Sequence, residues 1–597
     1  MRGMPKAWAV GGAILAVFHL AGLAGETTVY TTDQLRQTLS AARPGDRIYV
    51  APGRYNQLLW VQNVHGAPGN LIEVVALDPT NRPVFEAHSS AVFTFYNCSY
   101  ISVDGMIVQG AGTDTQDGNN IMFTFSDHMV LRNSVSRDIV HTGNSDGTKF
   151  NSSNNVLMYN CTISEWGEAG SAMDGMISNS DLFMRNTITF PSLATAASAN
   201  GIMPKGAAYH HGMYKNLFLD GSSRAVCFGG SGGATGPEIR DSVAMGNVIV
   251  GGEAAVAFVS ATTCEFAYNT IVDPEKWVMR VQKEGDYETD NCTFRRNLVQ
   301  YGPLLPYGGV QGTGGTVHPE TFTYEANYWY RSDNPAASIP YLPGGETDPA
   351  GGVDPRLDVD YRPLYGPAKA YGAHAPAMEA AFEQYTPWFQ WAWDRAMEYE
   401  PDADAGGPYQ VGPHQTVTLD AGGSYAGRGA YDDDPAHPDW HHRIASCQWD
   451  LDGDGVFDDA AGAASELAFE DLTGGGPGQL HLAFGRHAIE LRMEVATPYG
   501  TMVDWGRGEL LVLPGLPGDA NLDEVVGIAD LAALADHYGA PGGWGEGDFN
   551  FDGTLGIADL ATLADHYGET AGHPVPEPAT HVLLLMGGLL AVRRYRR

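Results

Sequence analysis

The stretch that decides the fold lies between residues 130 and 300, where one short pattern returns seven times. Its copies are VLRNSVSR (130–137), LMYNCTIS (157–164), FMRNTITF (183–190), MYKNLFLD (213–220), AMGNVIVG (244–251), AYNTIVD (267–273) and RRNLVQ (295–300). Successive Asn residues stand 27, 26, 30, 31, 22 and 28 positions apart. Such bounded but irregular spacing is typical of a parallel β-solenoid, in which stacking fixes the strand lengths while loop lengths drift. We therefore predict a right-handed parallel β-helix over residues 26–400.

The repeated Asn has a structural role in this prediction. In each copy apolar and polar residues alternate, and Asn then occupies a bend, where it tolerates left-handed backbone and can hydrogen-bond its counterpart in the next coil. The members of this ladder are Asn133, Asn160, Asn186, Asn216, Asn247, Asn269 and Asn297. We assign none of them to catalysis.

Two flanking segments are expected to cover the solenoid. Residues 31–55, TTDQLRQTLSAARPGDRIYVAPGRY, predict an amphipathic helix with apolar Leu35, Leu39 and Ala42 and a following strand, which would cap the open first coil. Residues 376–398 predict a helix packed over the far end. The first segment closely resembles the N-terminal cap of bacterial β-helix proteins, including polysaccharide lyases of the alginate lyase and chondroitinase B type. The resemblance covers roughly residues 27–370.

Composition limits the partners of the chain. The 597 residues include 34 basic and 71 acidic ones, a formal charge of −37, which disfavours nucleic acid and anionic lipid and suits calcium binding and extracellular solubility. The six cysteines form no CxxC pair or zinc-ligand spacing, so we expect buried thiols. Abundant Gly (75) and Pro (35) favour an all-β architecture.

Both ends of the chain carry targeting signals. Residues 1–25 place Arg2 and Lys6 before an apolar run that closes on small residues, which is the pattern of a signal peptide. Residues 574–597 join Pro576-Glu577-Pro578 to an apolar run at 582–592, too short to span a bilayer comfortably, and an arginine cluster. This end resembles the PEP-CTERM sorting signal. The resemblance implies recognition by export machinery and a place outside the cell or on the outer surface of a Gram-negative bacterium.

Residues 401–514 predict a small β-sandwich of short alternating strands. The segment Trp449 to Gly455, WDLDGDG, resembles that of PKD-type immunoglobulin-like modules. Asp450, Asp452 and Asp454 either hold calcium or form a solvated acidic turn, and the sequence leaves both open.

Residues 515–570 contain one unit twice, GDANLDEVVGIADLAALADHYG and GDFNFDGTLGIADLATLADHYG, offset by 29 positions. Each copy offers oxygen ligands at loop positions 1, 3, 5 and 12, a spacing that wraps a calcium ion. The predicted ligands are Asp519, Asn521, Asp523 and Asp530 in the first loop and Asp548, Asn550, Asp552 and Asp559 in the second. The pair resembles a type I dockerin, which implies a cohesin-type partner. Glu524 stands where loop position 6 usually carries Gly.

A charged group on the solenoid is the candidate active site. Lys149 and Lys205 each precede a ladder Asn by 11 residues, so we expect them in one column, two coils and about 10 Å apart. Asp174 is expected between them, with His141 and Asp146 in the loop leading into the site. A surface that only has to be soluble does not need two lysines, an aspartate and a histidine gathered in one place.

This group suits β-elimination on a uronate polymer, which needs a cation near the C5 carboxylate, a base for the C5 proton and an acid for the departing oxygen. Lys205 is the candidate base, if Lys149 and partial burial depress its pKa, and Lys149, Arg224 or a calcium ion held by Asp146 and Asp174 would stabilise negative charge. The lyase resemblance implies a catalytic Lys, which Lys205 matches. The family's catalytic Arg falls at Gly236, with Arg224 earlier in that coil.

Two other functions stay open. A glycoside hydrolase needs two carboxylates flanking the bond, and Asp146 with Asp174 is the pair available. A non-catalytic surface or matrix protein would bind glycan or protein through the same modules. The favoured prediction is a secreted polysaccharide lyase.

Overall fold

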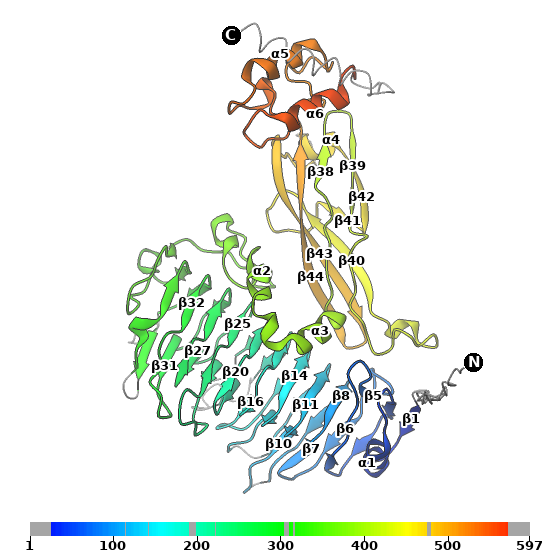
Figure 1. Cartoon of the computed structure of the whole chain (residues 1–597), viewed down its shortest axis with the longest axis vertical. Helices are drawn as coiled ribbons and strands as arrows, with labels where there is room; N and C mark the ends of the chain where they lie inside the picture. Colours follow the sequence, from blue (N-terminus) through cyan, green and yellow to red (C-terminus); the bar gives the residue numbers. More distant parts are fainter. Residues whose placement is uncertain are drawn as a thin grey trace, which may run out of the picture.

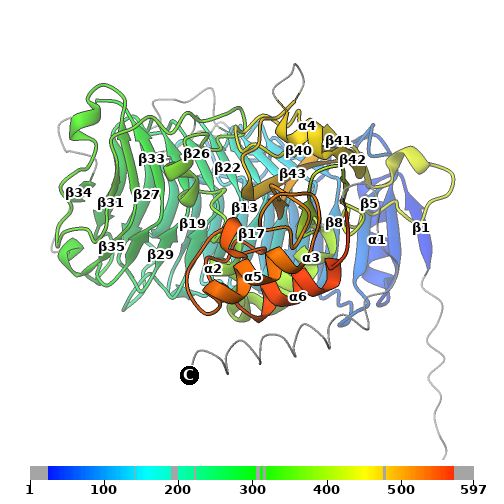
Figure 2. The ribbon, with the colours of Figure 1, turned by 90° about the horizontal axis from the view of Figure 1, so that it is seen from above.

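The computed structural model describes residues 25–113, 115–140, 143–189, 199–220, 223–303, 310–313, 317–474 and 479–570. The predicted signal peptide up to residue 24 and the sorting segment lie outside the described residues. In the described part, a right-handed parallel β-helix is followed by a smaller β domain and a pair of helices (Figure 1). Figure 2 shows the β-helix running across the view from β1 to β34 beneath these C-terminal parts.

Three long sheets of parallel strands form the β-helix. The first sheet contains β1 (Glu26–Val29), β2 (Arg47–Val50), β5 (Ile72–Ala76), β8 (Ser99–Asp104), β11 (Asp127–Arg132), β14 (Asn154–Tyr159), β17 (Leu182–Met184), β21 (Gly212–Tyr214), β25 (Val243–Met245), β29 (Glu265–Ala267), β32 (Thr293–Arg295) and β35 (Thr323–Glu325). The second contains β4 (Leu59–Gln62), β7 (Ala91–Tyr96), β10 (Asn119–Thr124), β13 (Thr148–Asn151), β16 (Ser171–Met176), β19 (Asn200–Lys205), β23 (Arg224–Gly229), β27 (Ala254–Val259), β31 (Trp277–Gln282) and β34 (Val310–Thr313). The third contains β3 (Arg54–Tyr55), β6 (Val84–Glu86), β9 (Ile107–Gln109), β12 (Val135–Arg137), β15 (Thr162–Ser164), β18 (Thr187–Thr189), β22 (Leu217–Leu219), β26 (Val248–Val250), β30 (Thr270–Val272), β33 (Leu298–Tyr301), β36 (Tyr328–Arg331) and β37 (Ala350–Gly351). A fourth set of short strands, β20 (Ala208–Tyr209), β24 (Ile239–Arg240) and β28 (Ala261–Thr262), forms a sheet of its own. In the chain, each of these strands lies between a strand of the second sheet and a strand of the first.

The predicted Asn ladder is confirmed from Asn186 to Asn297. Asn133 and Asn160 stand one register position earlier and occupy the left-handed corner themselves, whereas from Asn186 onward the residue before the ladder Asn has the left-handed backbone. Each side-chain amide from Asn186 to Asn269 donates to the Oδ1 atom of the next Asn over 2.8–3.2 Å, and Asn297 continues the series to Asn327. These side chains are buried, so each hydrogen bond satisfies polar groups that water does not reach. All six cysteines are buried free thiols, as expected.

The N-terminal cap is also confirmed. Helix α1 (Thr32–Ala41) begins after Thr31, whose hydroxyl accepts the N–H of Gln34, and it buries Leu35 and Leu39 against the first coil. None of the described helices is long and apolar enough to cross a bilayer.

The helix expected over the far end lies elsewhere. Helices α2 (Met378–Glu383) and α3 (Gln390–Tyr399) pack on the middle of the first sheet, where α3 contacts β14 and β17. The reason is the apolar outer face of that sheet: Val130, Leu157 and Leu182 point away from the solenoid core and need a cover. Burying such a patch is worth roughly 25 cal/mol per Å².

The smaller β domain completes this cover. It contains a five-stranded mixed sheet and a two-stranded antiparallel sheet. Their elements are β38 (Tyr409–Val411), β39 (Thr416–Asp420), β40 (Arg443–Asp450), β41 (Ala460–Ala461), β42 (Ala464–Ala468), α4 (Phe469–Thr473), β43 (Gly485–Thr497) and β44 (Gly500–Val512). One apolar cluster runs from the first sheet through α3 to Trp449 and Leu491 of this domain. The two domains therefore share a core.

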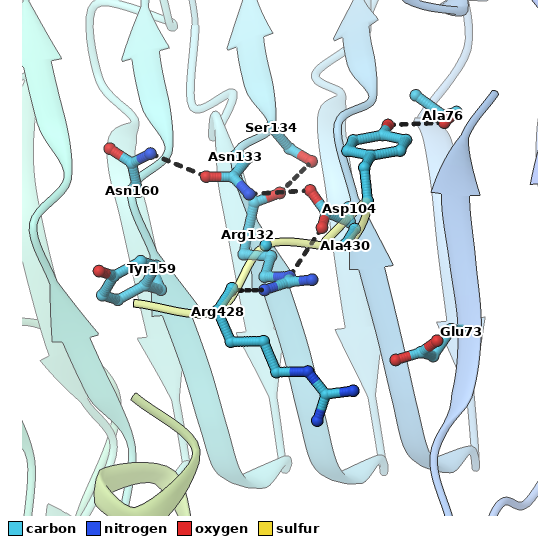
Figure 3. A network of polar contacts seen from close by, with 12 residues as sticks. Glu73, Ala76, Asp104, Arg132, Asn133, Ser134, Tyr159, Asn160, Arg428 and Ala430 are labelled. Atoms are coloured by element: carbon cyan, nitrogen blue, oxygen red, sulfur yellow. Dashed lines mark hydrogen bonds and ion pairs between the residues drawn. The ribbon is translucent and has the colours of Figure 1, made fainter. Parts of the chain in front are cut away.

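Polar contacts fix the same interface. Arg132, buried on β11, pairs with Asp104 over 2.7 Å and donates to the carbonyl of Arg428 (Figure 3). Its guanidinium also lies over the ring of Tyr399, 4.1 Å from the ring centre. Further along, Arg185 pairs with Glu400 over 2.6 Å and Asp504 over 3.0 Å.

The chain then forms α5 (Ile528–His537) and α6 (Ile557–His566), which pack through their own small core around Leu534 and Leu563. Six short 3-10 turns complete the described elements: Pro319–Thr321, Pro335–Ala337, Gly366–Ala370, Thr386–Phe389, Pro438–Trp440 and Trp544–Glu546.

Candidate active site

The second sheet brings Lys149, Asp174 and Lys205 together on its outer face. Lys149 lies on β13, Asp174 on the adjacent β16, and Lys205 ends β19, the next strand. Lys149 and Asp174 are register partners, because the loops between them keep the coils aligned. Stacking thus joins residues 25 and 31 positions apart in the chain.

The predicted register of Lys205 is wrong by two residues. Met203, not Lys205, is the partner of Asp174, and Lys205 pairs with Met176. One residue of this shift arises because Tyr159 pairs with Met184, which aligns Asn160 with the residue before Asn186. The other arises because the stretch from Met203 to Gly212 is one residue longer than that from Asp174 to Leu182.

The lysines nevertheless meet at one carboxylate. Lys149 Nζ lies 2.6 Å from Asp174 Oδ2 and 2.8 Å from Asp146 Oδ2. Lys205 Nζ lies 3.2 Å from Asp174 Oδ1, an atom that accepts no hydrogen bond from another described residue. Lys205 is therefore the more loosely held of the two cations, and a carboxylate separates it from Lys149.

Hydrogen bonds to the two neighbouring coils hold Asp146 in place. Its Oδ1 atom accepts the N–H of Ser171 over 2.9 Å, and its own N–H donates to Asn119 Oδ1. Burial, followed by the charge of Asp174, raises the pKa of Asp146 to about 6. Burial alone would lower the pKa of Lys149, but Asp146 and Asp174 outweigh it and raise that pKa above its usual value. Lys149 is a permanent cation here.

The two remaining predicted residues have different outcomes. Arg224 begins β23, and its guanidinium binds Asn200 and Glu284 over 2.7 Å each. These two contacts lie outside the Lys149–Asp174–Lys205 group. His141 lies outside the described residues.

The two predicted calcium loops make the same backbone hydrogen bonds to their first residue. Asp519 accepts the N–H groups of Asp523 and Glu524, and in the second loop Asp548 accepts those of Asp552 and Gly553. Burial raises the pKa of both Asp519 and Asp548. Loop position 6 is left-handed in both copies, at φ 67 for Glu524 and φ 81 for Gly553. At position 6 the first loop therefore carries backbone strain that the second avoids, whereas Leu522 and Phe551 are left-handed alike in the two loops.

Each loop closes on a buried carboxylate at the start of its helix. Asp530 accepts three N–H groups, from Ala520, Asn521 and Gly527, and Asp559 accepts those of Phe549 and Gly556. Carboxylate and amide oxygens are the ligands that Ca²⁺ prefers, although in the described residues no three carboxylates of one loop come within 4.8 Å of one another.

In the smaller β domain, the acidic group differs from the predicted one. Carboxylates of Asp450, Asp452 and Asp459, not Asp454, come within 4.8 Å of one another. Asp459 Oδ2 accepts the N–H of Leu451, and burial raises the pKa of Asp459 to about 6. The prediction missed Asp459 because this residue lies four positions beyond the Trp449 to Gly455 segment on which the prediction was based.

A cavity of about 350 Å³ lies at the interface between the β-helix and β44. Arg185, Lys215, His374 and Asp504 line it. Burial and nearby Arg362 lower the pKa of His374 to about 3, so this imidazole is neutral. The charged walls are the ion pairs that hold the two domains together.

Comparisons with known proteins agree with one predicted module. Residues 574–597 match the PEP-CTERM protein-sorting motif, which indicates export to the cell surface or the extracellular space of a Gram-negative bacterium. No curated protein matches the chain.

Among solved structures, the chain is similar to an alginate lyase from Paenibacillus sp. str. FPU-7, at 16% identity and a TM-score of 0.30, over 49% of this chain and 97% of that one. It is similar to the PL6 family alginate lyase AlyGC, at 14% identity and a TM-score of 0.30, over 65% of this chain and 61% of that one. The tailspike protein of E. coli bacteriophage HK620, as a double mutant, matches at 12% identity and a TM-score of 0.33, over 51% and 59%.

Proposed function

We propose that the protein is an exported polysaccharide lyase that cleaves a uronate-containing polymer on the outer face of the second sheet. The observation that carries the proposal is the ion-paired group in which Asp174 links Lys149 to Lys205. Two cations, on the coils either side of that of Asp174, provide one group to bind a substrate carboxylate and another to move a proton.

The contacts suggest separate roles. Lys149, held by two carboxylates, keeps its charge and would stabilise the enolate-like intermediate at the C5 carboxylate. Lys205, which pairs with one carboxylate, would take the C5 proton as the C4–C5 double bond forms and the C4–O4 bond breaks. Asp146, with a pKa of about 6, retains a protonated fraction near neutral pH and would donate to the departing oxygen.

The same geometry disfavours hydrolysis by Asp146 and Asp174. Because Lys149 Nζ lies 2.8 Å from one Oδ2 atom and 2.6 Å from the other, these oxygens are at most about 5.4 Å apart. An inverting hydrolase needs roughly 6.5–9.5 Å between its carboxyl groups. A retaining pair fits the distance, but the ammonium group occupies the place of the sugar.

The product distinguishes these reactions. Alginate, polygalacturonate and chondroitin sulfate are incubated with the protein, and absorbance of unsaturated uronate and new reducing ends are followed together. We expect both signals with one polymer, their loss in Lys205→Ala and their retention in Lys276→Ala, a lysine paired with Glu253 elsewhere on the β-helix. Reducing ends without absorbance would indicate a hydrolase, and neither signal would favour a glycan-binding matrix protein.

We further propose that the repeat pair at 515–570 is a dockerin-like module that binds two calcium ions, beside a PKD-like β domain. Titration of chelator-treated protein with CaCl₂ should show two sites. Asp559→Ala should remove one site, whereas Asp565→Ala, an exposed residue of α6, should leave both. Glu524→Gly should tighten the first site, because Gly adopts the left-handed conformation without strain.

A cohesin-type partner would cover the start of both helices. Ile528 and Ile557, the first residues of α5 and α6, occupy equivalent places and are among the most exposed large apolar residues of the module. Calorimetric titration with a cohesin domain tests this proposal. Binding should depend on calcium and disappear in a variant with Ile528→Asp and Ile557→Asp.

A further inference from the structure

Three aromatic residues lie on the outer face of the second sheet, on the N-terminal side of the lysine group. They are Trp60 on β4, Tyr96 at the end of β7 and Phe125 just after β10, and we call them the aromatic strip. The Trp60 and Tyr96 rings stack at 5.9 Å, and the Tyr96 and Phe125 rings meet edge-on at 5.5 Å. Trp60 is 41% exposed and Phe125 54%.

Register connects the strip to the candidate active site. Trp60 pairs with Thr94, Thr94 with Met122, and Met122 with Lys149, so Trp60 stands in the column of Lys149 and Asp174. The column of Tyr96 leads in the same way to Lys205. From Trp60 to Asp174 the face spans four strand spacings, roughly 19 Å. The rings and the charges therefore share two columns of one outer face, in which Thr94 and Thr124 are buried.

The other side of the lysine group is closed. Cys227, Ala257 and Val259 continue the outer columns of the second sheet but are completely buried. The segment around Gly230 lies against the Lys205 side chain. An extended ligand that reaches Lys205 along this face must therefore pass over the strip.

Phe125 is an unfavourable residue for its position. The residues that follow the second sheet's strands here have left-handed backbone: Asn63 at φ 56, Asn97 at φ 50, Phe125 at φ 50, Ser152 at φ 51 and Ile177 at φ 57. Asn and Ser are suited to such a corner, whereas the bulky side chains of Phe125 and Ile177 are strained there and also expose apolar surface. Strain of this kind collects where a side chain serves a binding site.

We propose that the aromatic strip is a glycan-binding subsite that stacks the pyranose rings of the polymer and leads it to Lys149 and Lys205. The spacing fits, because strands stack roughly 4.8 Å apart, close to the length that one pyranosyl residue adds to an extended chain. Sugar faces are apolar enough to pack on aromatic rings, and the neighbouring lysines attract uronate carboxylates. The choice of a uronate polymer rests on the proposed function, whereas the stacking role does not require cleavage.

Affinity electrophoresis in gels containing alginate, polygalacturonate, chondroitin sulfate or neutral xylan tests the subsite. We expect at least one of the three acidic polymers to retard the parent protein. The double variant Trp60→Ala/Phe125→Ala should lose at least ten-fold in affinity for that polymer. Tyr341→Ala, which removes an 86% exposed ring elsewhere, should bind as the parent does. Unchanged melting temperatures would show that the variants fold.

The outcomes separate the subsite from the chemistry. Retardation that depends on Trp60 and Phe125 but comes without cleavage would refute the lyase proposal and support the subsite. The Lys205→Ala variant should still be retarded. A parent protein that no polymer retards would overturn the subsite. So would a double variant that binds as the parent does, or a parent dimer that the two substitutions dissociate, since the rings would then serve self-association.

Discussion

Two outer faces of the β-helix carry ion-paired groups, and these groups have different surroundings. On the first sheet, Arg185 lies under the smaller β domain, where Glu400 and Asp504 pair with it and the three side chains are 14%, 7% and 9% exposed. On the second sheet, Lys149 and Lys205 also meet carboxylates, and their side chains are 22% and 14% exposed, but no described domain covers them. The first group holds two domains together, and the second is accessible to a ligand.

The comparison teaches that ion pairing alone does not identify a site. Both groups combine cations with buried carboxylates, and what differs is the surface around them. The outer face of the first sheet is apolar and meets α3, whereas that of the second carries exposed rings beside the charges. Function is therefore better sought on the second sheet.

The largest expected effect is on the covered face. Glu400→Ala should lower the free energy of unfolding by about 3–5 kcal/mol at pH 7, because Arg185 and Lys215 would lose a buried partner. Arg185 and Lys215 outweigh burial and hold the pKa of Glu400 below its usual value, so its contribution should fade at acid pH. Urea unfolding measures the change. Glu398→Ala, paired with Arg395 at the surface, is the control and should cost under about 1 kcal/mol.

The sequence predicted the features that depend on local spacing. The Asn residues from Asn186 to Asn297 indicate the coils, but counting back 11 residues from Asn160 and Asn186 pairs Lys149 with Gly175, one residue away from its true partner Asp174. It did not predict that Glu400 would meet Arg185, because nothing near either residue specifies a partner 215 positions away. Nor did it predict Phe125: Phe123 and Phe125 alternate as an inward pair, and only the left-handed backbone at Phe125 turns its ring outward.

On the open face, removal of a cation should cost less. Lys149→Met leaves Asp146 and Asp174 without their shared ammonium group, and we expect a loss of about 2 kcal/mol at pH 7. Water and proton uptake by Asp146 should limit the loss. A measured loss equal to that of Glu400→Ala would contradict the contrast between the two faces, and Lys276→Met provides the baseline.

The pH dependence of stability should report Asp146 directly. Its pKa of about 6 lies above that of an unfolded Asp, so the native state binds the proton more tightly. The contribution is complete below pH 4 and is lost as the pH rises through 6. Asp146→Asn should therefore lose about 1 kcal/mol less stability than the parent between pH 5 and 7. Urea unfolding at several pH values measures this, and equal slopes for both proteins would refute it.

The smallest effect concerns the strained ring of the aromatic strip. Phe125→Asn should raise the free energy of unfolding by about 0.5–1 kcal/mol, because Asn accepts the left-handed backbone that Phe resists and the loss of the Tyr96 contact cancels part of the gain. Ser152→Asn, at the same corner one coil further, tests how much the site itself favours Asn. Stability that rises while polymer binding falls would show that this face keeps its ring for a ligand. If Phe125→Asn instead destabilised the protein, the ring would have a structural role. The contrast between a covered, structural face and an open, functional face would then fail at this position.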